Sequence, residues 1–476
     1  MHGENYKINL RLVIMSSKSI SRSVIWQFAG KLSLQGLAFF TAPVFTRLLS
    51  PSDYGYVSLY TSWCSIVGIF VAMEVVGSIG NARIKYDGMD VYAYLSSILT
   101  LTLIPFALFL CGALLFNAWL APLMGLRRDL VILVVLNAYA TFLTNLMTAK
   151  LDTYKQVEKS ALLSFFQGFV IFAVSLFFVI RSRNDRAVIK IYSQAIPTIL
   201  IGLTVCVVVY IKGKCFWKWE YNRFCLTLTL PLLGHSIGGL IFAQCDRLML
   251  HQMQNESQLG MYSIIYTLCG ILMTIYSAFN IAWVPFYYDF KKQKKEQEII
   301  SHTKRYIKFF TLVCVGFLLL AEDVFKLLAP ELYWQGINSI PIFVLSFYFN
   351  YLYLFPVNFE FYHHCTGFIP VATIISAVTN VIMNMLLIPR FSMYGAAVGS
   401  LISHVFLFCI HEIFAKFFVK KNYEYNLKIF IPGVVVLMLF AIFFYLLKDF
   451  FALRCSLAVL TGGYLIAEII RNKAIF

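Results

Sequence analysis

Long apolar stretches, each about the length of a membrane-spanning helix, recur along the whole chain and alternate with short polar connections. A helix needs roughly 20 mainly apolar residues to cross a bilayer, whereas a strand of a membrane barrel needs only about ten alternating ones. The pattern therefore predicts an all-α integral membrane protein. It predicts about 14 spans, near residues 24–46, 57–80, 92–116, 130–149, 161–180, 191–211, 224–245, 260–288, 306–328, 337–358, 369–389, 395–415, 429–447 and 451–470.

The composition supports the same class of protein. Of the 476 residues, 60% are hydrophobic and only 13% are charged, whereas soluble domains carry about 25% charged residues. The formal net charge of +16 would suggest a nucleic-acid partner for a soluble protein. Basic loops that set membrane orientation explain it better here, so no nucleic acid is expected. The 11 cysteines are scattered and form no CxxC pair, so we expect no metal site, disulfide framework or cofactor.

Basic residues divide unevenly between the two faces. The two termini and the loops that follow even-numbered spans hold 25 Lys and Arg residues, and the opposite loops hold 12. The positive-inside rule therefore predicts that both termini are cytoplasmic. The basic run 291–305 is then a cytoplasmic connector, which either stays solvated and sets orientation or contacts anionic lipid. No signal-peptide cleavage site follows the N-terminus, and Met15 is a plausible alternative start.

An internal repeat suggests two related halves. The segments "TRLLSPSDYGYVS" (46–58) and "DRLMLHQMQNESQLGMYS" (246–263) both end a span on Arg-Leu, continue through a polar turn, and then place a glycine three positions before a serine. Six spans precede the second copy, so the two copies would share one orientation. The predicted organisation is an N-terminal lobe (15–211), a C-terminal lobe (212–419) and two additional spans (420–476).

Three segments also carry a family resemblance. "PVFTRLLSPSDYGYVSLY" resembles the end of the first helix and the first external loop of Wzx-type polysaccharide-repeat (O-antigen) flippases, which belong to the polysaccharide transporter family of the MOP superfamily. "LPLLGHSIGGLIFAQCDRLMLHQMQNESQLGMYSIIYTL" is similar to a further part of that family. "TNVIMNMLLIPRFSMYGAAVGSLISH" resembles its eleventh and twelfth helices. The motifs are diffuse and none is catalytic.

The resemblance implies a MATE-like fold, in which two six-helix lobes enclose a cavity that opens alternately to each face. The implied cargo is an undecaprenyl-diphosphate-linked oligosaccharide of O-antigen or capsule. It would move from the cytoplasmic to the periplasmic leaflet of a bacterial inner membrane, with coupling to an ion. The implied partners are the lipid-linked oligosaccharide and membrane lipids, together with a polysaccharide polymerase and a chain-length regulator. No enzymatic activity is implied.

Lys31 is the ionisable residue that stands out in the first span. It shares a helical face with Ser23, Gln27 and Gln35, because the four residues recur at four-residue steps. At 1.5 Å per residue it lies roughly 13 Å inside Arg22, which marks the membrane interface. Charges inside spans are costly and are functional candidates, and lysine binds phosphate as a point charge. We therefore expect Gln27, Lys31 and Gln35 to contact cargo, with a snorkelling lysine as the alternative.

Three titratable residues are candidates for ion coupling. Glu74 can pair with Lys31 or exchange a proton, and a structural ion pair is the alternative reading. His235 can titrate near neutral pH, or it can be a hydrogen-bonded packing residue. Asp246 lies at the external end of its span, beside Arg247.

Arginines and amides complete the candidate cargo contacts. Arg47 and Arg247 either anchor helix ends and cap carbonyls, or form an external gate or phosphate-release site in which Asp246 neutralises one of them. Asn380 belongs to a polar stripe that serves either interhelical hydrogen bonding or contact with sugar hydroxyls. The other members of the stripe are Thr373, Ser376 and Asn384.

Other readings stay open. Drug antiporters of the same fold usually have 12 spans and often an acidic residue in the first, whereas this chain is predicted to have 14 and carries a lysine there. A peptidoglycan-precursor flippase is similar in span number but tends to carry several cavity arginines, which the spans here lack. A membrane-embedded polysaccharide enzyme needs a catalytic loop, and no connector contains a DxD or paired-carboxylate cluster. The most economical interpretation is the polysaccharide flippase.

Overall fold

The apolar runs of the sequence form helices, because a helix satisfies its backbone N–H and C=O groups within one segment and so can lie in hydrocarbon. The computed structural model describes residues 41–88, 90–419 and 422–472. Throughout these ranges the regular elements are helical, which confirms the predicted all-α class. Gln27, Lys31 and Gln35 lie outside the described residues.

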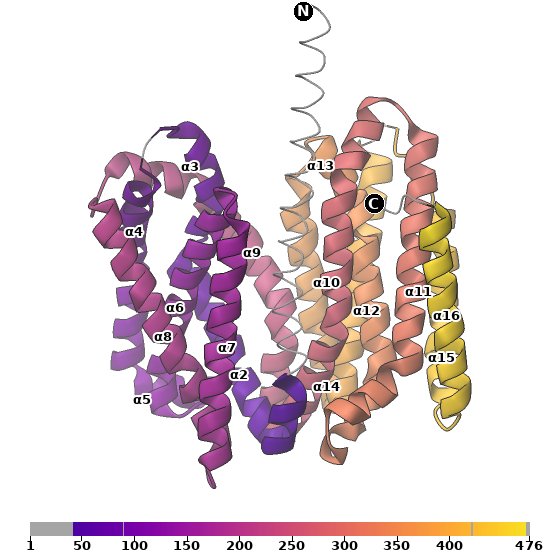
Figure 1. Ribbon diagram of the computed structural model, residues 1–476, viewed down its shortest axis with the longest axis horizontal. Coiled ribbons are helices and arrows are strands. Elements are labelled where there is room, and N and C mark those ends of the chain that lie inside the picture. The colour runs from indigo at the N-terminus through magenta and orange to yellow at the C-terminus, as the bar shows by residue number, and fades with distance from the viewer. Residues whose placement is uncertain (1–40, 89, 420–421, 473–476) are drawn as a thin grey trace, which may run out of the picture. The chain divides into compact units, whose positions relative to one another are not determined.

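A helical segment at residues 41–48 precedes the labelled helices. The labelled helices are, in chain order, α2 (Pro51–Ala72), η1 (Val75–Ser78), α3 (Ile79–Lys85), α4 (Val91–Leu115), α5 (Asn117–Met124), α6 (Arg128–Thr153), α7 (Val157–Arg181), α8 (Arg186–Gly213), α9 (Trp219–Met253), α10 (Glu256–Lys292), α11 (Glu296–Leu328), η2 (Glu331–Ser339), α12 (Ile340–Leu352), α13 (Leu354–Tyr362), α14 (Phe368–Ile413), η3 (Phe414–Val419), η4 (Leu427–Ile429), α15 (Ile431–Leu446) and α16 (Phe451–Asn472) (Figure 1).

The helices agree with the predicted spans. In the described ranges, nine helical segments are long and apolar enough to cross a membrane, or ten if the two halves of α9 count as one span. Each predicted span from 57–80 to 451–470 overlaps a helix of the structure. The first predicted span, 24–46, lies largely outside the described residues. The chain is therefore a multi-pass helical membrane protein.

The 46-residue α14 covers two predicted spans, 369–389 and 395–415. At Ser392 the backbone has φ 53° and ψ −132°, which is not helical. A positive φ is uncommon for a residue other than glycine. A Cβ on Gly395 would lie 2.4 Å from the Leu387 carbonyl oxygen, and one on Gly399 would lie 2.5 Å from Oδ1 of Asn384. The two halves of α14 therefore form a closely packed antiparallel hairpin around Ser392.

The chain divides into two compact units, described here separately. In the first, which includes Trp63–Leu233, helices α4, α6, α7 and α8 pack side by side. The ring of Tyr139 on α6 stacks on Phe106 of α4 with their centroids 4.2 Å apart. A Cβ on Gly202 would lie 2.9 Å from the Ala140 backbone, so glycine lets α8 approach α6 closely. Most of α7 exposes apolar side chains, as a lipid-facing helix does.

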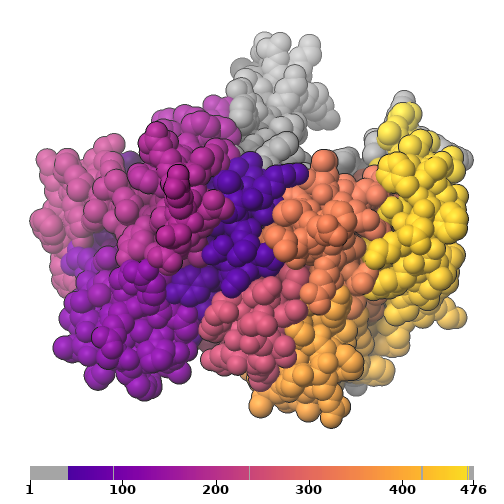
Figure 2. Space-filling model, turned by 90° about the horizontal axis from the view of Figure 1, so that it is seen from below, coloured from indigo at the N-terminus to yellow at the C-terminus, as the bar shows by residue number. Residues whose placement is uncertain are grey.

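The second unit comprises Ala42–Ser62 and the chain from Gly234 onward. Helices α10, α11, α12 and α14 enclose an aromatic core, in which Phe310 and Tyr351 have ring centroids 4.4 Å apart. Helices α15 and α16 pack on α11. Figure 2 shows α16, in yellow, with much of its surface uncovered, and many of its exposed side chains are apolar.

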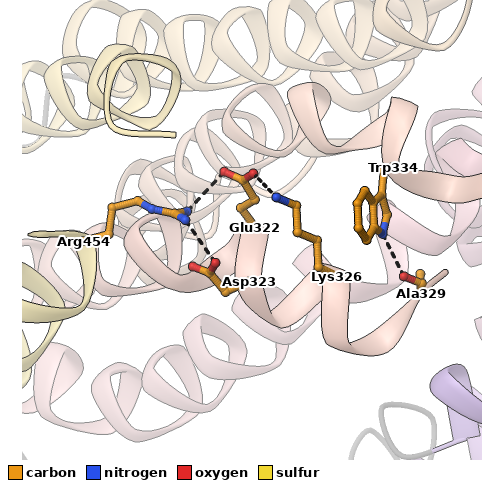
Figure 3. Close-up of polar contacts among 6 residues, drawn as sticks. All are labelled: Glu322, Asp323, Lys326, Ala329, Trp334 and Arg454. Carbon is orange, nitrogen blue, oxygen red and sulfur yellow. Dashed lines mark hydrogen bonds and ion pairs between the residues drawn. The ribbon is translucent and has the colours of Figure 1, made fainter. Parts of the chain in front are cut away.

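An ion-pair network attaches α16 to α11 (Figure 3). Arg454 of α16 donates to Glu322 at 3.1 Å and to Asp323 at 3.0 Å, and Lys326 lies 2.7 Å from the other oxygen of Glu322. Glu322 is fully buried and Arg454 is 3% exposed. A buried charge is tolerated when it is paired and hydrogen-bonded, so this network compensates the Glu322 carboxylate and specifies where α16 docks.

The two copies of the sequence repeat pack against each other within the second unit. A Cβ on Gly55 would lie 1.8 Å from the Glu256 carbonyl oxygen, and one on Gly260 would lie 1.9 Å from the Pro51 carbonyl oxygen. The hydroxyls of Ser58 and Ser263 are 2.6 Å apart and hydrogen-bonded. The repeated glycine and serine are therefore the residues through which the first turns of α2 and α10 touch.

Candidate functional site

Asp246 is the centre of a buried polar cluster in the second unit. It lies on α9 and is 3% exposed. The Tyr262 hydroxyl donates to its Oδ2 at 2.5 Å, and the Asn384 side-chain amide donates to its Oδ1 at 2.6 Å. The Ser400 hydroxyl also donates to Oδ2. Asn384 in turn donates to Oδ1 of the fully buried Asn380 at 3.1 Å.

Three helices build this cluster. α9 contributes Asp246 and α10 contributes Tyr262, whereas Asn384 and Ser400 come from opposite halves of α14. The hairpin at Ser392 turns the chain back on itself, and Gly399 leaves room for the Asn384 side chain beside it. The local backbone of α14 therefore places an amide and a hydroxyl on the same carboxylate.

The Asp246 carboxylate is held by neutral donors. Among the described residues it forms no ion pair, although Arg247 is its neighbour in sequence. Three buried polar atoms of the stripe on α14 have no hydrogen-bond partner: Oγ of Ser376, Nδ2 of Asn380 and Oδ1 of Asn384. A buried charge without a counter-charge is costly, and the three neutral donors supply the hydrogen bonds that compensate the carboxylate here. The described ranges contain no group of three or more His, Cys, Asp or Glu that could hold a metal ion.

The two predicted arginines do not contact Asp246 in the described part of the chain. The guanidinium of Arg247 lies 4.6 Å from the ring centroid of Tyr266 and donates to Gln244 at 3.0 Å. Arg47 donates to the carbonyl oxygens of Pro43 at 2.8 Å and Leu327 at 2.9 Å. These hydrogen bonds are of the kind that the first of the two readings describes, and contact with cargo stays a prediction.

The other two ion-coupling candidates are Glu74, in the first unit, and His235, in the second. Glu74 joins α2 to η1 with φ 53°, is half-buried, and has no ion pair within the described ranges. The side chain of His235 lies outside what the structure describes. Sequence reasoning thus singled out Asp246 and Asn380, which the structure brings together through Asn384. It missed Tyr262 and Ser400, although Tyr262 stands inside the repeated segment 246–263.

A buried pair of titratable side chains, separate from the Asp246 cluster, lies in the same unit. Nδ1 of His411, at the end of α14, is 2.8 Å from Oε1 of Glu360 on α13, and both side chains are fully buried. Closer to Asp246 on α14, the His404 ring shares its Nδ1 between the Ser346 hydroxyl at 2.8 Å and the Ser400 carbonyl oxygen at 2.9 Å. No pattern in the sequence links Glu360 with His411. Only the fold shows that they are adjacent.

Helices with exposed apolar surfaces around buried polar clusters define a multi-pass membrane protein. A solved structure described as the lipid II flippase MurJ in its inward closed conformation superposes with a TM-score of 0.70 at 15% identity, covering 94% of this chain and 99% of that one. An inward-facing multidrug resistance MATE family transporter of the MOP superfamily superposes with a TM-score of 0.58 at 13% identity, covering 84% of this chain and all of that one. These likenesses confirm the predicted MATE-like fold.

The chain belongs to the polysaccharide biosynthesis protein family, whose family model matches residues 20–291. Two relatives are similar over most of its length. One is the probable low-salt glycan biosynthesis flippase Agl15 of Haloferax volcanii, which is 22% identical over 86% of each chain. The other is the capsular polysaccharide biosynthesis protein CapF of Staphylococcus aureus, which is 24% identical over 76% of this chain and 90% of its own.

Proposed function

We propose that the protein is a flippase for lipid-linked oligosaccharides. Its cargo is an undecaprenyl-diphosphate-linked repeat unit of O-antigen or capsule, carried from the cytoplasmic to the periplasmic leaflet of a bacterial inner membrane. The family match carries this proposal, because a polysaccharide biosynthesis protein with the fold of a lipid II flippase needs a glycan and a lipid carrier to act on. The flippase named among its relatives supports the same reading. The protein acts as a transporter and not as an enzyme.

Transport works by alternating access between two lobes. In this proposal residues 15–211 and 212–419 are the moving lobes, residues 420–476 add two further helices, and both termini are cytoplasmic. The uneven distribution of 25 and 12 basic residues between the two sets of loops supports the orientation. A polymerase and a chain-length regulator are the proposed protein partners, because they would consume the delivered repeat units.

Asp246 couples transport to an ion. Its carboxylate is buried among the Tyr262, Ser400 and Asn384 donors without a counter-charge, so the energy of the site changes strongly when a proton or monovalent cation enters. A coupling ion acts by stabilising one conformation over another, and it needs a differential affinity for the two. Glu74 and His235 remain secondary proposals for the same role.

Cargo contacts are proposed at two places. Gln27, Lys31 and Gln35 form the polar face of the first span and would meet the diphosphate. Arg47, Arg247 and Asn380 would meet the cargo on its way out. Lys31→Ala should reduce export at unchanged protein levels, and Lys31→Arg should restore part of it, because arginine keeps the charge. Full export by Lys31→Ala would reduce the residue to an anchor at the membrane interface.

Deletion of the gene tests the function itself. Surface polysaccharide should disappear, and lipid-linked repeat units should accumulate on the cytoplasmic side, with both effects reversed by the wild-type chain. Persistence of surface polysaccharide in a strain without a redundant transporter would refute the proposal.

Transport of a peptidoglycan precursor is the second candidate function, favoured by the TM-score of 0.70 to a lipid II flippase. It predicts a different outcome for the same deletion. Cells would accumulate lipid-linked peptidoglycan precursor and lose wall synthesis, whereas the polysaccharide repeat would still be exported. Measuring both lipid-linked pools in one strain separates the two functions.

A further inference from the structure

The termini of three helices of the first unit meet at one place. The first turn of α4, the last turn of α6 and the last turn of α8 meet there. A Cβ on Gly213, at the end of α8, would lie 2.2 Å from the Tyr92 carbonyl oxygen and 2.4 Å from Oγ of Ser96. Ser96 also donates to the Cys215 carbonyl oxygen at 2.8 Å. The close approach at Gly213 and this hydrogen bond fix the end of α8 against the start of α4.

Two lysines meet on a single tyrosine ring at this point. Nζ of Lys150, from α6, lies 4.7 Å from the ring centroid of Tyr92 and donates to its hydroxyl at 3.3 Å. Nζ of Lys212, from α8, lies 5.0 Å from the same centroid. Tyr154 adds a second ring, 5.8 Å from the Lys150 ammonium. We call Tyr92, Lys150, Tyr154 and Lys212 the Tyr92 cluster.

Lys150 is buried without a counter-charge. It is 6% exposed, and among the described residues neither Lys150 nor Lys212 forms an ion pair. Asp152, two residues after Lys150, is exposed. Asp90 is also exposed and is engaged as the N-cap of α4, where its carboxylate accepts from the Tyr92 backbone N–H. An ammonium has three donors, of which Lys150 uses one here. A buried cation with spare donors is stabilised further when it gains an anionic partner.

Exposed apolar side chains flank Lys212 in the sequence. Ile211 is 65% exposed, Phe216 is 69% exposed and Trp217 is 48% exposed. Tryptophan and tyrosine favour the level of the lipid headgroups. An anion bound here would therefore sit beside side chains that prefer acyl chains to water. An anionic lipid supplies both a negative charge for the lysines and acyl chains for the apolar side chains. A free phosphate ion supplies only the negative charge.

We propose that the Tyr92 cluster binds the phosphate of an anionic membrane lipid such as phosphatidylglycerol or cardiolipin. The ammonium groups of Lys150 and Lys212 contact phosphate oxygens, and Ile211 and Trp217 contact the acyl chains. In the proposed orientation this end of the unit is cytoplasmic, and basic pockets between membrane helices on that side suit anionic headgroups. The site does not depend on the identity of the transported cargo.

Lipid retention by the purified full-length chain tests the site. In native mass spectrometry, wild-type protein should keep phosphatidylglycerol in preference to phosphatidylcholine. Lys212→Gln and Lys150→Met should each weaken phosphatidylglycerol retention roughly fivefold, in line with the usual contribution of one surface lysine. Lys212 is exposed, so Lys212→Gln leaves the packing of the unit intact and stays informative even if Lys150→Met folds poorly.

Lys218→Gln is the matched control. Its ammonium also lies over a ring, 4.1 Å from the centroid of Tyr221, but it has a carboxylate partner in Glu220 at 3.6 Å. It should bind phosphatidylglycerol like the wild type. Equal retention of the two lipids, or equal losses in Lys212→Gln and Lys218→Gln, would overturn the proposal. Displacement of the lipid by millimolar inorganic phosphate would overturn the choice of a lipid over a free ion.

Discussion

Replacing Gly260 with alanine should separate the two copies of the repeat. The added Cβ would lie 1.9 Å from the Pro51 carbonyl oxygen and 2.9 Å from the Gly55 backbone nitrogen. Real Cβ contacts essentially never fall below 3.0 Å, so the first turns of α2 and α10 must move apart by about 1 Å. The obstructing atoms belong to the backbone, and no side-chain rotation can relieve the clash.

Overpacking of this kind costs about 1–3 kcal/mol, and replacing a helical glycine by alanine returns up to about 1 kcal/mol. Gly260→Ala should therefore lower the free energy of unfolding by up to about 2 kcal/mol once the return of about 1 kcal/mol is subtracted. Gly55→Ala should behave alike, because its Cβ would meet the Glu256 carbonyl oxygen at 1.8 Å. The two changes open the same contact, so the double variant should lose less stability than the two single losses combined.

Thermal unfolding of the purified protein in detergent measures these differences. The control is Gly68→Ala, also in α2, where an added Cβ has no neighbour within 4 Å. That variant should equal or exceed the wild type in stability. If Gly260→Ala unfolded at the same temperature as Gly68→Ala, or if the Gly55 and Gly260 losses were additive, the reasoning about backbone contact would fail.

Three further predictions concern other contacts of the second unit. Arg454→Ala should destabilise the protein by about 3–5 kcal/mol, because it leaves the buried Glu322 short of a partner. A double variant with Glu322→Gln should recover part of the loss in the same unfolding assay, and no recovery would count against a buried ion pair. Ser58 and Ser263 can be replaced by cysteines in a background without the 11 native cysteines. The pair should form a disulfide under mild oxidation, which altered gel mobility would detect. Free thiols at both positions would contradict the contact. Asp246→Asn should fold, since the amide oxygen can still accept from Asn384 and the amide NH2 can donate to the Tyr262 and Ser400 hydroxyls. Export by this variant should lose its dependence on the ion gradient, and unchanged ion dependence would exclude Asp246 from coupling.

Part of the polar cluster around Asp246 was predictable from the sequence, and part of it was not. Asp246 and Asn380 were predictable as candidates, because a polar residue inside an apolar span is costly and so attracts attention. Their convergence was not predictable, since it depends on the hairpin that Ser392 introduces into α14. Ser400 looked like an ordinary small residue in an apolar helix. Its role appears only when the second half of α14 folds back against the first.

Lys150 is a residue whose structural role the sequence did not indicate. Between two spans, in a basic connector, it counts toward membrane orientation and nothing more. The structure buries it against Tyr92 at the end of α6. Likewise, Glu322 and Arg454 are 132 residues apart in sequence, and no local pattern links them. Burial and pairing of this kind depend on which helix ends meet, which is a property of packing.

Hydrophobic periodicity and charge by themselves determined that this chain is a multi-pass helical membrane protein and where its helices fall. They suffice because the bilayer imposes a length and a polarity on each segment independently of its neighbours. The family resemblance rests instead on the residues of three particular segments. Only the tertiary structure decided that the two repeat copies touch through Gly55 and Gly260, that neutral donors surround Asp246, and that two lysines share Tyr92. Contacts between helices depend on side-chain shape and backbone approach across segments distant in sequence, and no single segment contains that information.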